Sequence, residues 1–336
     1  MIEREITERV ALTGADGALN PAALGWSRLP LHDTSGIPGR GHWGRNKRWE
    51  YWGVMTPTHI VALTVSCIDY LSLHSVWVFD RATGEAIDET VLSPGGRSAT
   101  LPKSLGEGPA RARTRKVTLD IDEMEDGTRL RARTARVCFD ITAARPAGHE
   151  SLGVVVPWQR ARGIRRFQYT VKDVARPAHG TLTIDGNGFE VPAGSWAVLD
   201  HGRGRWPYQV WWNWAVGSGI VDRRVIGLQL GSKWTDGSGA TENAVVVDGR
   251  LSKISEELVW DYDSSNWMTP WHVHGESAAL TFTPFYNKHS QTNVLVISTR
   301  TDQLFGTWSG WVLDDAGVRV SVDGIEGWAE DVLNRW

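Results

Sequence analysis

Hydrophobic positions in this chain recur with a period of two from about Trp49 onward, and a helical period of 3.6 is nearly absent. Such alternation is typical of β-strands, whose successive side chains point to opposite faces of a sheet. Turn sequences such as Asp185-Gly186-Asn187-Gly188 and Asp248-Gly249 separate many of these segments. No stretch predicts a long amphipathic helix, so we expect an all-β protein with few helices.

The pattern predicts strands at residues 59–67, 74–80, 129–141, 152–157, 165–172, 180–184, 196–199, 224–231, 243–248, 251–261, 276–284, 293–300, 305–313 and 318–322. Residues 1–45 contain scattered glycine and proline residues, which predict an irregular lead-in. Residues 93–113 form a long polar stretch without a clear period. We expect a surface loop there, either disordered or acting as a lid.

The two halves of the strand-rich region share an order of elements. Residues 51–80 and 212–248 each contain an aromatic strand, an apolar strand, and a strand that ends in Asp before a turn. This echo favours two antiparallel domains, residues 46–175 and 176–336, with an expected joint near residues 173–180. Internal duplication is a hypothesis at this stage, because antiparallel β-sequences also resemble one another by chance.

Composition narrows the classes of protein and partner. The chain has 336 residues, a net charge of -3, 41% hydrophobic and 22% charged residues, which is typical of a soluble globular protein. No clustered basic surface is evident, so we expect no nucleic-acid partner. No apolar run approaches the roughly 18 residues of a membrane span, and the N-terminus lacks a secretory pattern. We therefore expect a cytoplasmic protein; its oligomeric state is left open.

The densest group of chemically versatile side chains lies in residues 200–219. Four of the 19 tryptophans fall there, beside an acid, a histidine, two arginines and an asparagine. Aromatic surface near titratable groups is typical of a small-molecule pocket, although a Trp-rich core strand after a charged, glycine-containing loop would look similar. The catalytic candidates are Asp200 and His201. The substrate-binding candidates in this stretch are Arg203, Trp206, Tyr208, Trp212, Asn213 and Trp214.

A second candidate segment follows at residues 234–243. Residues 234–239 predict a tight loop in which Asp236, a further substrate-binding candidate, accepts backbone N–H bonds. Glu242 and Asn243 then begin an otherwise apolar strand. Polar side chains at the mouth of a buried strand can point into a cavity, so Glu242 is a candidate catalytic acid and Asn243 a candidate orienting amide.

Further candidates lie toward the C-terminus. Trp271 and His272 form another aromatic–histidine pair and are expected to bind substrate. His272 and His274 alternate as if on one strand face, yet no third ligand has metal-site spacing, so we expect no metal. Glu330 and Arg335 are expected to form a structural ion pair.

Established cofactor and nucleophile motifs are missing from the sequence. There is no P-loop, no Gly-rich dinucleotide turn and no nucleophile-elbow serine. We therefore expect neither a nucleotide cofactor nor serine hydrolysis.

Several motifs together resemble one bacterial family. They are His201-Gly202-Arg203-Gly204-Arg205-Trp206-Pro207-Tyr208, Trp212-Asn213-Trp214-Ala215, Trp234-Thr235-Asp236-Gly237, Thr241-Glu242-Asn243 and Gly327-Trp328-Ala329-Glu330. From about Trp49 to the end, the chain resembles the family described as domain of unknown function 2804. That name assigns no activity.

The family is more distantly similar to two-domain lipocalin-like (calycin) proteins, such as carotenoid 1,2-hydratase, tocopherol cyclase and lipocalin-like Diels–Alderases. This resemblance implies two calycin-like β-barrels or half-barrels with a ligand site within or between them. It transfers no catalytic residue.

Our leading interpretation is an enzyme acting on a small apolar or glycosylated molecule without a redox cofactor, by hydration, cyclisation, isomerisation or elimination. Asp200 or Glu242 would be the general acid, its pKa raised by burial, and His201 its proton partner. Asn213 and Asn243 would orient the substrate between tryptophan walls.

Two alternatives remain open. A glycosidase would use Asp200 and Glu242 as its carboxylate pair and stack sugars on tryptophans. A non-catalytic lipocalin-like binder of a hydrophobic ligand would instead pair these carboxylates with arginine and turn them away from its cavity.

Overall fold

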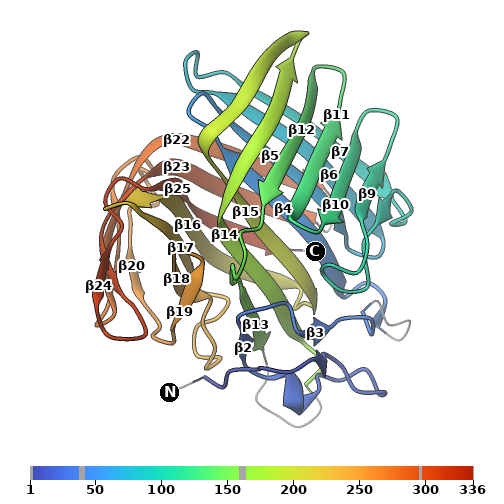
Figure 1. Ribbon diagram of the computed structural model, residues 1–336. Coiled ribbons are helices and arrows are strands. Elements are labelled where there is room, and N and C mark those ends of the chain that lie inside the picture. The colour runs from blue at the N-terminus through green and yellow to red at the C-terminus, as the bar shows by residue number, and fades with distance from the viewer. Residues whose placement is uncertain (1–2, 38–41, 159–163, 295–296, 336) are drawn as a thin grey trace.

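The computed structural model describes residues 3–37, 42–158, 164–294 and 297–335, so residues 38–41 of the lead-in lie outside the described part. Within the described residues the helical element is a single 3-10 turn, η1 (Pro21–Ala23), and the rest of the regular structure is strand. Two curled antiparallel sheets make up the molecule (Figure 1). The expected all-β fold of two lipocalin-like half-barrels is confirmed.

The larger sheet follows the order β7-β6-β5-β4-β15-β14-β12-β11-β10-β9-β8, with β13 paired to β14 and β2 paired to β13. Its strands are β2 (Trp26–Ser27), β4 (Asn46–Met55), β5 (His59–Cys67), β6 (Leu71–Asp80), β7 (Ala86–Pro94), β8 (Ala99–Thr100), β9 (Ala110–Arg113), β10 (Thr118–Met124), β11 (Gly127–Arg133), β12 (Val137–Ala144), β13 (Leu152–Pro157), β14 (Phe167–Ile184) and β15 (Asn187–Arg205). In the lead-in, β1 (Val10–Ala11) and β3 (His32–Asp33) form a short parallel pair.

The smaller sheet follows the order β19-β18-β17-β16-β25-β23-β22-β21-β20, with β24 paired to β23. Its strands are β16 (Gln209–Val221), β17 (Arg224–Ser232), β18 (Asn243–Val247), β19 (Arg250–Ile254), β20 (Val259–Asp261), β21 (Trp271–His274), β22 (Ala278–Val294), β23 (Ile297–Leu313), β24 (Arg319–Ser321) and β25 (Glu326–Arg335). The described residues contain no helix that is long and apolar enough to cross a membrane.

The two sheets repeat one connectivity. Each begins with a four-strand meander, β4 to β7 in one and β16 to β19 in the other. In each sheet the last strand along the chain returns to pair with the first strand of this meander, β15 with β4 and β25 with β16. This shared topology supports the duplication suggested by the sequence echo.

The passage from one sheet to the other comes between β15 and β16, later in the chain than the expected boundary between residues 175 and 176. That boundary falls inside β14, which pairs with β15 on both sides of it. The register shifts between Asp173 and Arg176, and Ala175 has a φ of 56°. The segment around the expected joint, residues 173–180, is therefore a bulged part of one long strand.

Several strand predictions match the structure, including residues 59–67 as β5 and 152–157 as β13. The prediction of one strand over residues 129–141 was wrong, because the chain turns back there and β11 pairs with β12. In that turn the Thr134 hydroxyl accepts the Val137 N–H at 3.0 Å. Residues 93–113 are not a plain loop either, since they include β8 and β9.

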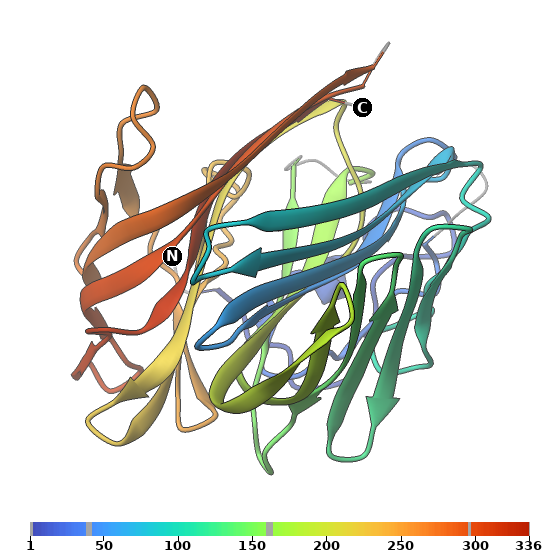
Figure 2. The ribbon, with the colours of Figure 1, turned by 90° about the horizontal axis from the view of Figure 1, so that it is seen from above.

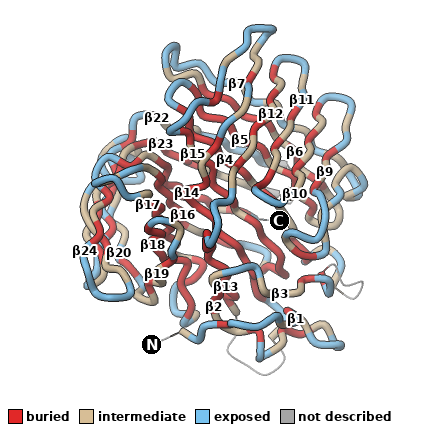
Figure 3. The backbone as a smooth tube through the Cα atoms, viewed as in Figure 1, coloured by how far each residue is buried: buried red, intermediate tan, exposed pale blue. Residues whose placement is uncertain are grey.

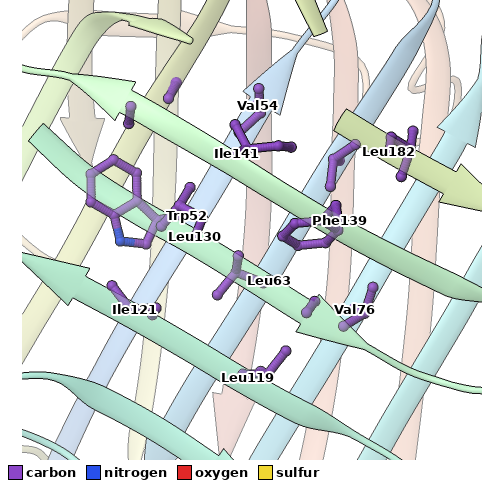
Figure 4. Close-up of a cluster of buried hydrophobic side chains, with 14 of the residues drawn as sticks. Trp52, Val54, Leu63, Val76, Leu119, Ile121, Leu130, Phe139, Ile141 and Leu182 are labelled. Atoms are coloured by element: carbon purple, nitrogen blue, oxygen red, sulfur yellow. The ribbon is translucent and has the colours of Figure 1, made fainter. Parts of the chain in front are cut away.

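Buried residues are concentrated in the strands of both sheets, whereas the turns that join the strands are mostly exposed (Figure 3). Inside the larger curl, Leu130 and Phe139 from β11 and β12 face Trp52 and Leu63 from β4 and β5 (Figure 4). The smaller curl has its own core around Trp308. Figure 2 shows the two curled sheets lying against each other. A third apolar cluster draws residues from both sheets, including Trp328 of the smaller sheet and Ile60 of the larger. Strands at this junction are therefore buried on both faces.

Candidate active site between the two sheets

A cavity of about 240 Å³ lies in the layer between the sheets. The larger sheet and its adjoining residues contribute Lys47, Trp49, Thr64, Ser66, Ile68, Leu73, Gln168, Thr170, Lys172, Asp200 and Trp206. The smaller sheet and its loops contribute Trp212, Trp214, Trp234, Glu242 and Glu330. Five indoles and three carboxyl groups thus share one enclosure, a combination typical of small-molecule sites.

The register of β14 and β15 assembles the polar wall of this cavity. Lys172 pairs directly with Asp200, and Thr170 pairs with Gly202. Because alternate residues of a strand share a face, Gln168, Thr170 and Lys172 all lie on the cavity side.

Asp200 to Arg205 remain within β15, so the predicted glycine-punctuated loop after Leu199 was wrong. The glycines serve close packing instead. A Cβ on Gly202 would lie 2.1 Å from the Trp49 ring, and one on Gly204 would lie 2.2 Å from Gln168 Oε1. Gly202 and Gly204 therefore let Trp49 and the Gln168 amide lie flat against the strand.

Asp200 accepts hydrogen bonds from three side chains. Lys172 Nζ lies 3.0 Å and the Thr170 hydroxyl 3.1 Å from Oδ1, and Trp49 Nε1 lies 3.0 Å from Oδ2. All three partners are donors, which is the environment that an ionised carboxylate accepts. These three contacts fix the position of the Asp200 carboxyl group in the cavity wall.

Lys172 connects two of the cavity carboxyl groups. Its ammonium lies 3.9 Å from Glu242 Oε2 in addition to its contact with Asp200. It also sits 4.0 Å from the centre of the Trp214 ring, within the range of a cation–π interaction. The side chain is only 6% exposed, so water screens these interactions little.

Glu242 and Glu330 are both held in the apolar layer, and burial raises the pKa of each to about 7. For Glu242, the Lys172 ammonium and a Trp234 hydrogen bond oppose this increase in pKa only partly, and Oε2 has no hydrogen-bond partner. Near neutral pH, Glu242 is therefore a carboxyl group that exists in both protonation states.

Glu330 does not form the structural ion pair that was expected for it. Its oxygens accept from Trp212 Nε1 at 2.9 Å and Gln303 Nε2 at 3.0 Å, so the predicted ion pair with Arg335 was wrong. Residue alternation on β25 turns this side chain into the layer between the sheets, where it lines the cavity.

His201 and Arg203 lie on the face of β15 that is opposite the cavity. His201 Nδ1 is 3.6 Å and Arg203 Nη2 3.4 Å from Glu50 Oε1, and all three side chains are buried. Burial, reinforced by the Arg203 charge, holds the pKa of His201 well below its ordinary value. The structure therefore does not bring His201 to the cavity side of Asp200.

The predicted orienting amides bind protein groups away from the cavity. Asn213 donates to the Glu330 carbonyl at 3.0 Å. Asn243 accepts the Gly231 N–H at 2.9 Å and donates to the Glu256 carbonyl at 2.8 Å. Asn213 and Asn243 directly follow the cavity-lining residues Trp212 and Glu242 in the sequence. Because successive side chains of a strand point to opposite faces, the two amides point away from the cavity.

The other predicted binding residues are also outside the cavity. Asp236 accepts the Lys233 N–H at 2.8 Å, which confirms its predicted role in a turn. Trp271 is buried in the smaller curl and stacks on Tyr262 at 4.0 Å. Tyr208 and His272 have exposed side chains.

No cluster of three or more metal-ligating side chains occurs among the described residues. His274, which alternates with His272 on β21, pairs with Asp261 at 2.8 Å.

Of the predicted site residues, the structure brings together Asp200, Glu242, Trp206, Trp212 and Trp214. Sequence reasoning missed the chemical role open to Lys172, Gln168, Glu330, Trp49 and Trp234. A signal for the first two was available, because the segment Gln168-Tyr169-Thr170-Val171-Lys172 alternates polar and apolar residues within an otherwise buried strand. Their position opposite Asp200 depended on sheet register.

The fold and cavity define a class: a lipocalin-like protein of two half-barrel sheets with a candidate small-molecule site between them. The chain belongs to the family described as Domain of unknown function (DUF2804), whose model matches residues 3–336. The match thus includes most of the lead-in as well as the region that carries the motifs.

Solved structures with this fold share little sequence with the chain. Kievitone hydratase from Nectria haematococca is 12% identical with a TM-score of 0.52, covering 98% of this chain and 97% of its own. An AttH-type protein from Nitrosomonas europaea is 12% identical with a TM-score of 0.52, covering 85% and 92%. CghA, in a complex with Sch210972, is 10% identical with a TM-score of 0.50, covering 87% and 89%. No curated protein matches the chain. At such identities the likeness shows the fold.

Proposed function

We propose that the cavity is the active site of an enzyme that transfers a proton to a small, largely apolar molecule. Glu242 is the proposed general acid. The observation that carries this proposal is its carboxyl group, which is buried in an indole-lined cavity, has a pKa near 7 and leaves Oε2 without a hydrogen-bond partner. A general acid is most effective when its pKa is close to the working pH.

The proposed chemistry begins at a carbon–carbon double bond. The π electron pair takes the Glu242 proton and forms a C–H bond, which leaves a cationic carbon. The faces of Trp206, Trp212 and Trp214 would stabilise that charge. Water or an internal nucleophile then bonds to the carbon, and the proton that it releases returns to the Glu242 carboxylate, directly or through Glu330, so Glu242 is protonated again and the net result is hydration or cyclisation.

The named relatives support this reaction class at the level of fold. One protein with the same two-sheet architecture is named as a hydratase, and another has been seen in complex with the small molecule Sch210972. An architecture that hosts such a hydratase is compatible with proton-driven addition here.

The alternatives are less favoured by the geometry. A glycosidase needs a carboxyl pair open to sugar and water, whereas Asp200 and Glu242 both have the Lys172 ammonium within 4 Å. A simple binder would pair these acids with arginine outside the cavity, but both residues line it.

A turnover screen in D₂O tests the proposal. A library of apolar alkenes, including phenolic and terpenoid compounds, is incubated with the protein and analysed by liquid chromatography and mass spectrometry. We expect a product that has gained D₂O, or an isomer that carries one new C–D bond. Replacing Glu242 with Gln should slow its formation by about 10²–10⁴-fold, the usual contribution of a general acid.

Glu190→Gln is the matched control, since Glu190 is exposed on β15 and does not line the cavity. It should retain the wild-type rate. Equal rates for wild type and E242Q would remove Glu242 from the mechanism. Compounds that bind but emerge chemically unchanged and free of deuterium would favour the binder instead.

A further inference from the structure

Gln168 Nε2 and Glu242 Oε2 are buried polar atoms on cavity-lining side chains, and neither has a hydrogen-bond partner. They come from different sheets, Gln168 from β14 and Glu242 from the residue before β18. Burying an amide donor without an acceptor is unfavourable, so a ligand oxygen that accepts from it would be bound more tightly. Glu242 has a proposed role, whereas the Gln168 amide does not yet have one.

The orientation of the Gln168 amide follows from its neighbour. Trp206 Nε1 lies 2.5 Å from Gln168 Oε1, and an indole nitrogen can only donate. The carbonyl end must therefore face Trp206, and the NH₂ group is the end left for another acceptor. Gly204, directly opposite on β15, leaves the space that this arrangement needs.

Most other hydrogen-bond donors around the cavity already donate to acceptors within the protein. Trp49, Trp212 and Trp214 donate to Asp200, Glu330 and Gln229, respectively. These indoles therefore present carbon faces rather than N–H groups to a ligand.

The hydroxyl and ammonium groups follow the same pattern. Thr170 and Lys172 donate to Asp200, and Ser66 donates to the Leu73 carbonyl. Among these side chains, the Gln168 amide and the Glu242 carboxyl are left for polar recognition of a ligand. The Lys47 ammonium also lines the cavity and lies 5.1 Å from the centre of the Tyr70 ring.

We propose that the cavity binds a ring-containing, largely apolar molecule through one oxygen acceptor, a carbonyl or a hydroxyl, to which Gln168 Nε2 donates. This inference rests on the proposed function and names the ligand class of the same site. The indole faces would pack against the rings, and the oxygen would satisfy the amide. The wall carries two lysines, Lys47 and Lys172, as well as the carboxyl groups of Asp200, Glu242 and Glu330, so no single sign of charge is left to attract an ionic ligand.

A ligand series that needs no turnover tests the inference. Tetralin, 1-tetralone and 1-tetralol share one bicyclic skeleton and differ in a single oxygen function. Titration calorimetry and quenching of tryptophan fluorescence would report their binding. We expect at least one of the two oxygen compounds to bind about 10-fold more tightly than tetralin, as one good hydrogen bond to a buried donor allows.

The two oxygen compounds distinguish the carbonyl from the hydroxyl acceptor. Tighter binding of the ketone identifies a carbonyl, and tighter binding of the alcohol a hydroxyl. Equal affinity for tetralin and both oxygen compounds would overturn the inference.

Substitutions locate the effect at the amide. Gln168→Glu keeps an oxygen acceptor for the Trp206 indole and, at alkaline pH where the new carboxyl is ionised, lacks a donor. Under that condition it should reduce the preference for oxygen compounds to about 2-fold or less. Gln168→Met removes both groups and should do the same. Tetralin should bind to Q168M much as it binds to the wild type.

Gln229→Glu is the matched control. Gln229 also accepts an indole N–H, from Trp214 at 2.9 Å, but it does not line the cavity. Q229E should retain the preference for the oxygen compounds. Loss of that preference in Q229E as strongly as in Q168E would indicate general disturbance of the wall and contradict the assignment. Near-ultraviolet circular dichroism verifies that each variant is folded.

The outcome separates this inference from the proposed function. Oxygen selectivity is measured with compounds that need not react, whereas the D₂O screen depends on Glu242. Turnover without oxygen selectivity would reject only the role of Gln168 and leave the proposed enzyme in place. Selectivity without turnover would reject the enzyme and leave a selective binder.

Discussion

Glu242 illustrates how one side chain can carry both a stability cost and a chemical capability. Its carboxyl group is 1% exposed, and burial raises its pKa to about 7. An ordinary glutamate in the unfolded chain has a pKa near 4.3. The folded protein therefore holds the Glu242 proton more tightly than the unfolded chain does. Between these two pKa values, rising pH ionises the unfolded chain first and lowers the free energy of unfolding.

This linkage predicts a pH-dependent effect of Glu242→Gln. The amide cannot ionise, so the variant should gain stability relative to wild type as pH rises. We expect a difference below about 1 kcal/mol at pH 5 that grows to about 3 kcal/mol at pH 8.5, since one pKa unit corresponds to about 1.4 kcal/mol. Urea unfolding of both proteins across this pH range measures the difference.

The exposed Glu190→Gln variant provides the comparison and should differ from wild type by less than about 0.5 kcal/mol throughout. A constant difference between E242Q and wild type at every pH would contradict a raised Glu242 pKa. Glu330, whose pKa is also raised to about 7, remains in both proteins, and its charge contributes to the raised pKa of Glu242.

Individual elements were predictable where local pattern alone decided them. β5 and β13 match their predicted ranges, because each is an apolar run between clear turn signals. The course of the backbone around Gly202 could not be predicted from local pattern. Glycines ordinarily favour turns, yet Gly202 and Gly204 continue β15 because Trp49 and Gln168 pack against them.

The packing of β15 predicts the effect of Gly202→Ala. The added methyl group would lie 2.1 Å from the Trp49 ring, so the ring or the strand must move. We expect a loss of about 1–3 kcal/mol, typical of overpacking, and a changed tryptophan fluorescence spectrum as Trp49 leaves Asp200. Chemical unfolding and fluorescence of the purified variant provide the measurement.

Gly188→Ala on the same strand is the matched substitution. A Cβ there meets no heavy atom within 4 Å, and its backbone is not in the left-handed region. It should alter stability by about 0.5 kcal/mol or less. Comparable losses for G188A and G202A would show that backbone entropy, rather than the Trp49 contact, sets the requirement for glycine.

At the scale of the whole molecule, the layer between the sheets joins the two half-barrels. Trp328 on β25 is fully buried there and contacts Trp214 and, from the other sheet, Tyr51, with ring centroids 5.3 and 6.0 Å apart. Gly53 on β4 leaves room for this ring, since a Cβ would lie 2.6 Å from it. The two sheets should therefore fold as one cooperative unit.

Trp328→Ala tests that cooperativity. Removing a fully buried indole should cost about 3–5 kcal/mol. Hydrogen–deuterium exchange should show faster opening of β5 in the larger sheet and β17 in the smaller sheet together. Trp43→Ala, at a side chain that is 69% exposed, should change little. Faster exchange confined to β17 and its neighbours would mean that the half-barrels unfold independently.

The sequence by itself determined the all-β class, many of the strands, the family motifs and five of the cavity residues. These follow from local patterns, because alternation and turn chemistry operate within a few residues. Tertiary structure decided which strand face meets the opposite sheet, and therefore why Asp200 lines the cavity while His201 does not. It also brought Lys172 beside Asp200 and Glu330 into the same enclosure. Register and sheet packing depend on contacts between residues far apart in the chain, which no local pattern of this sequence could reveal.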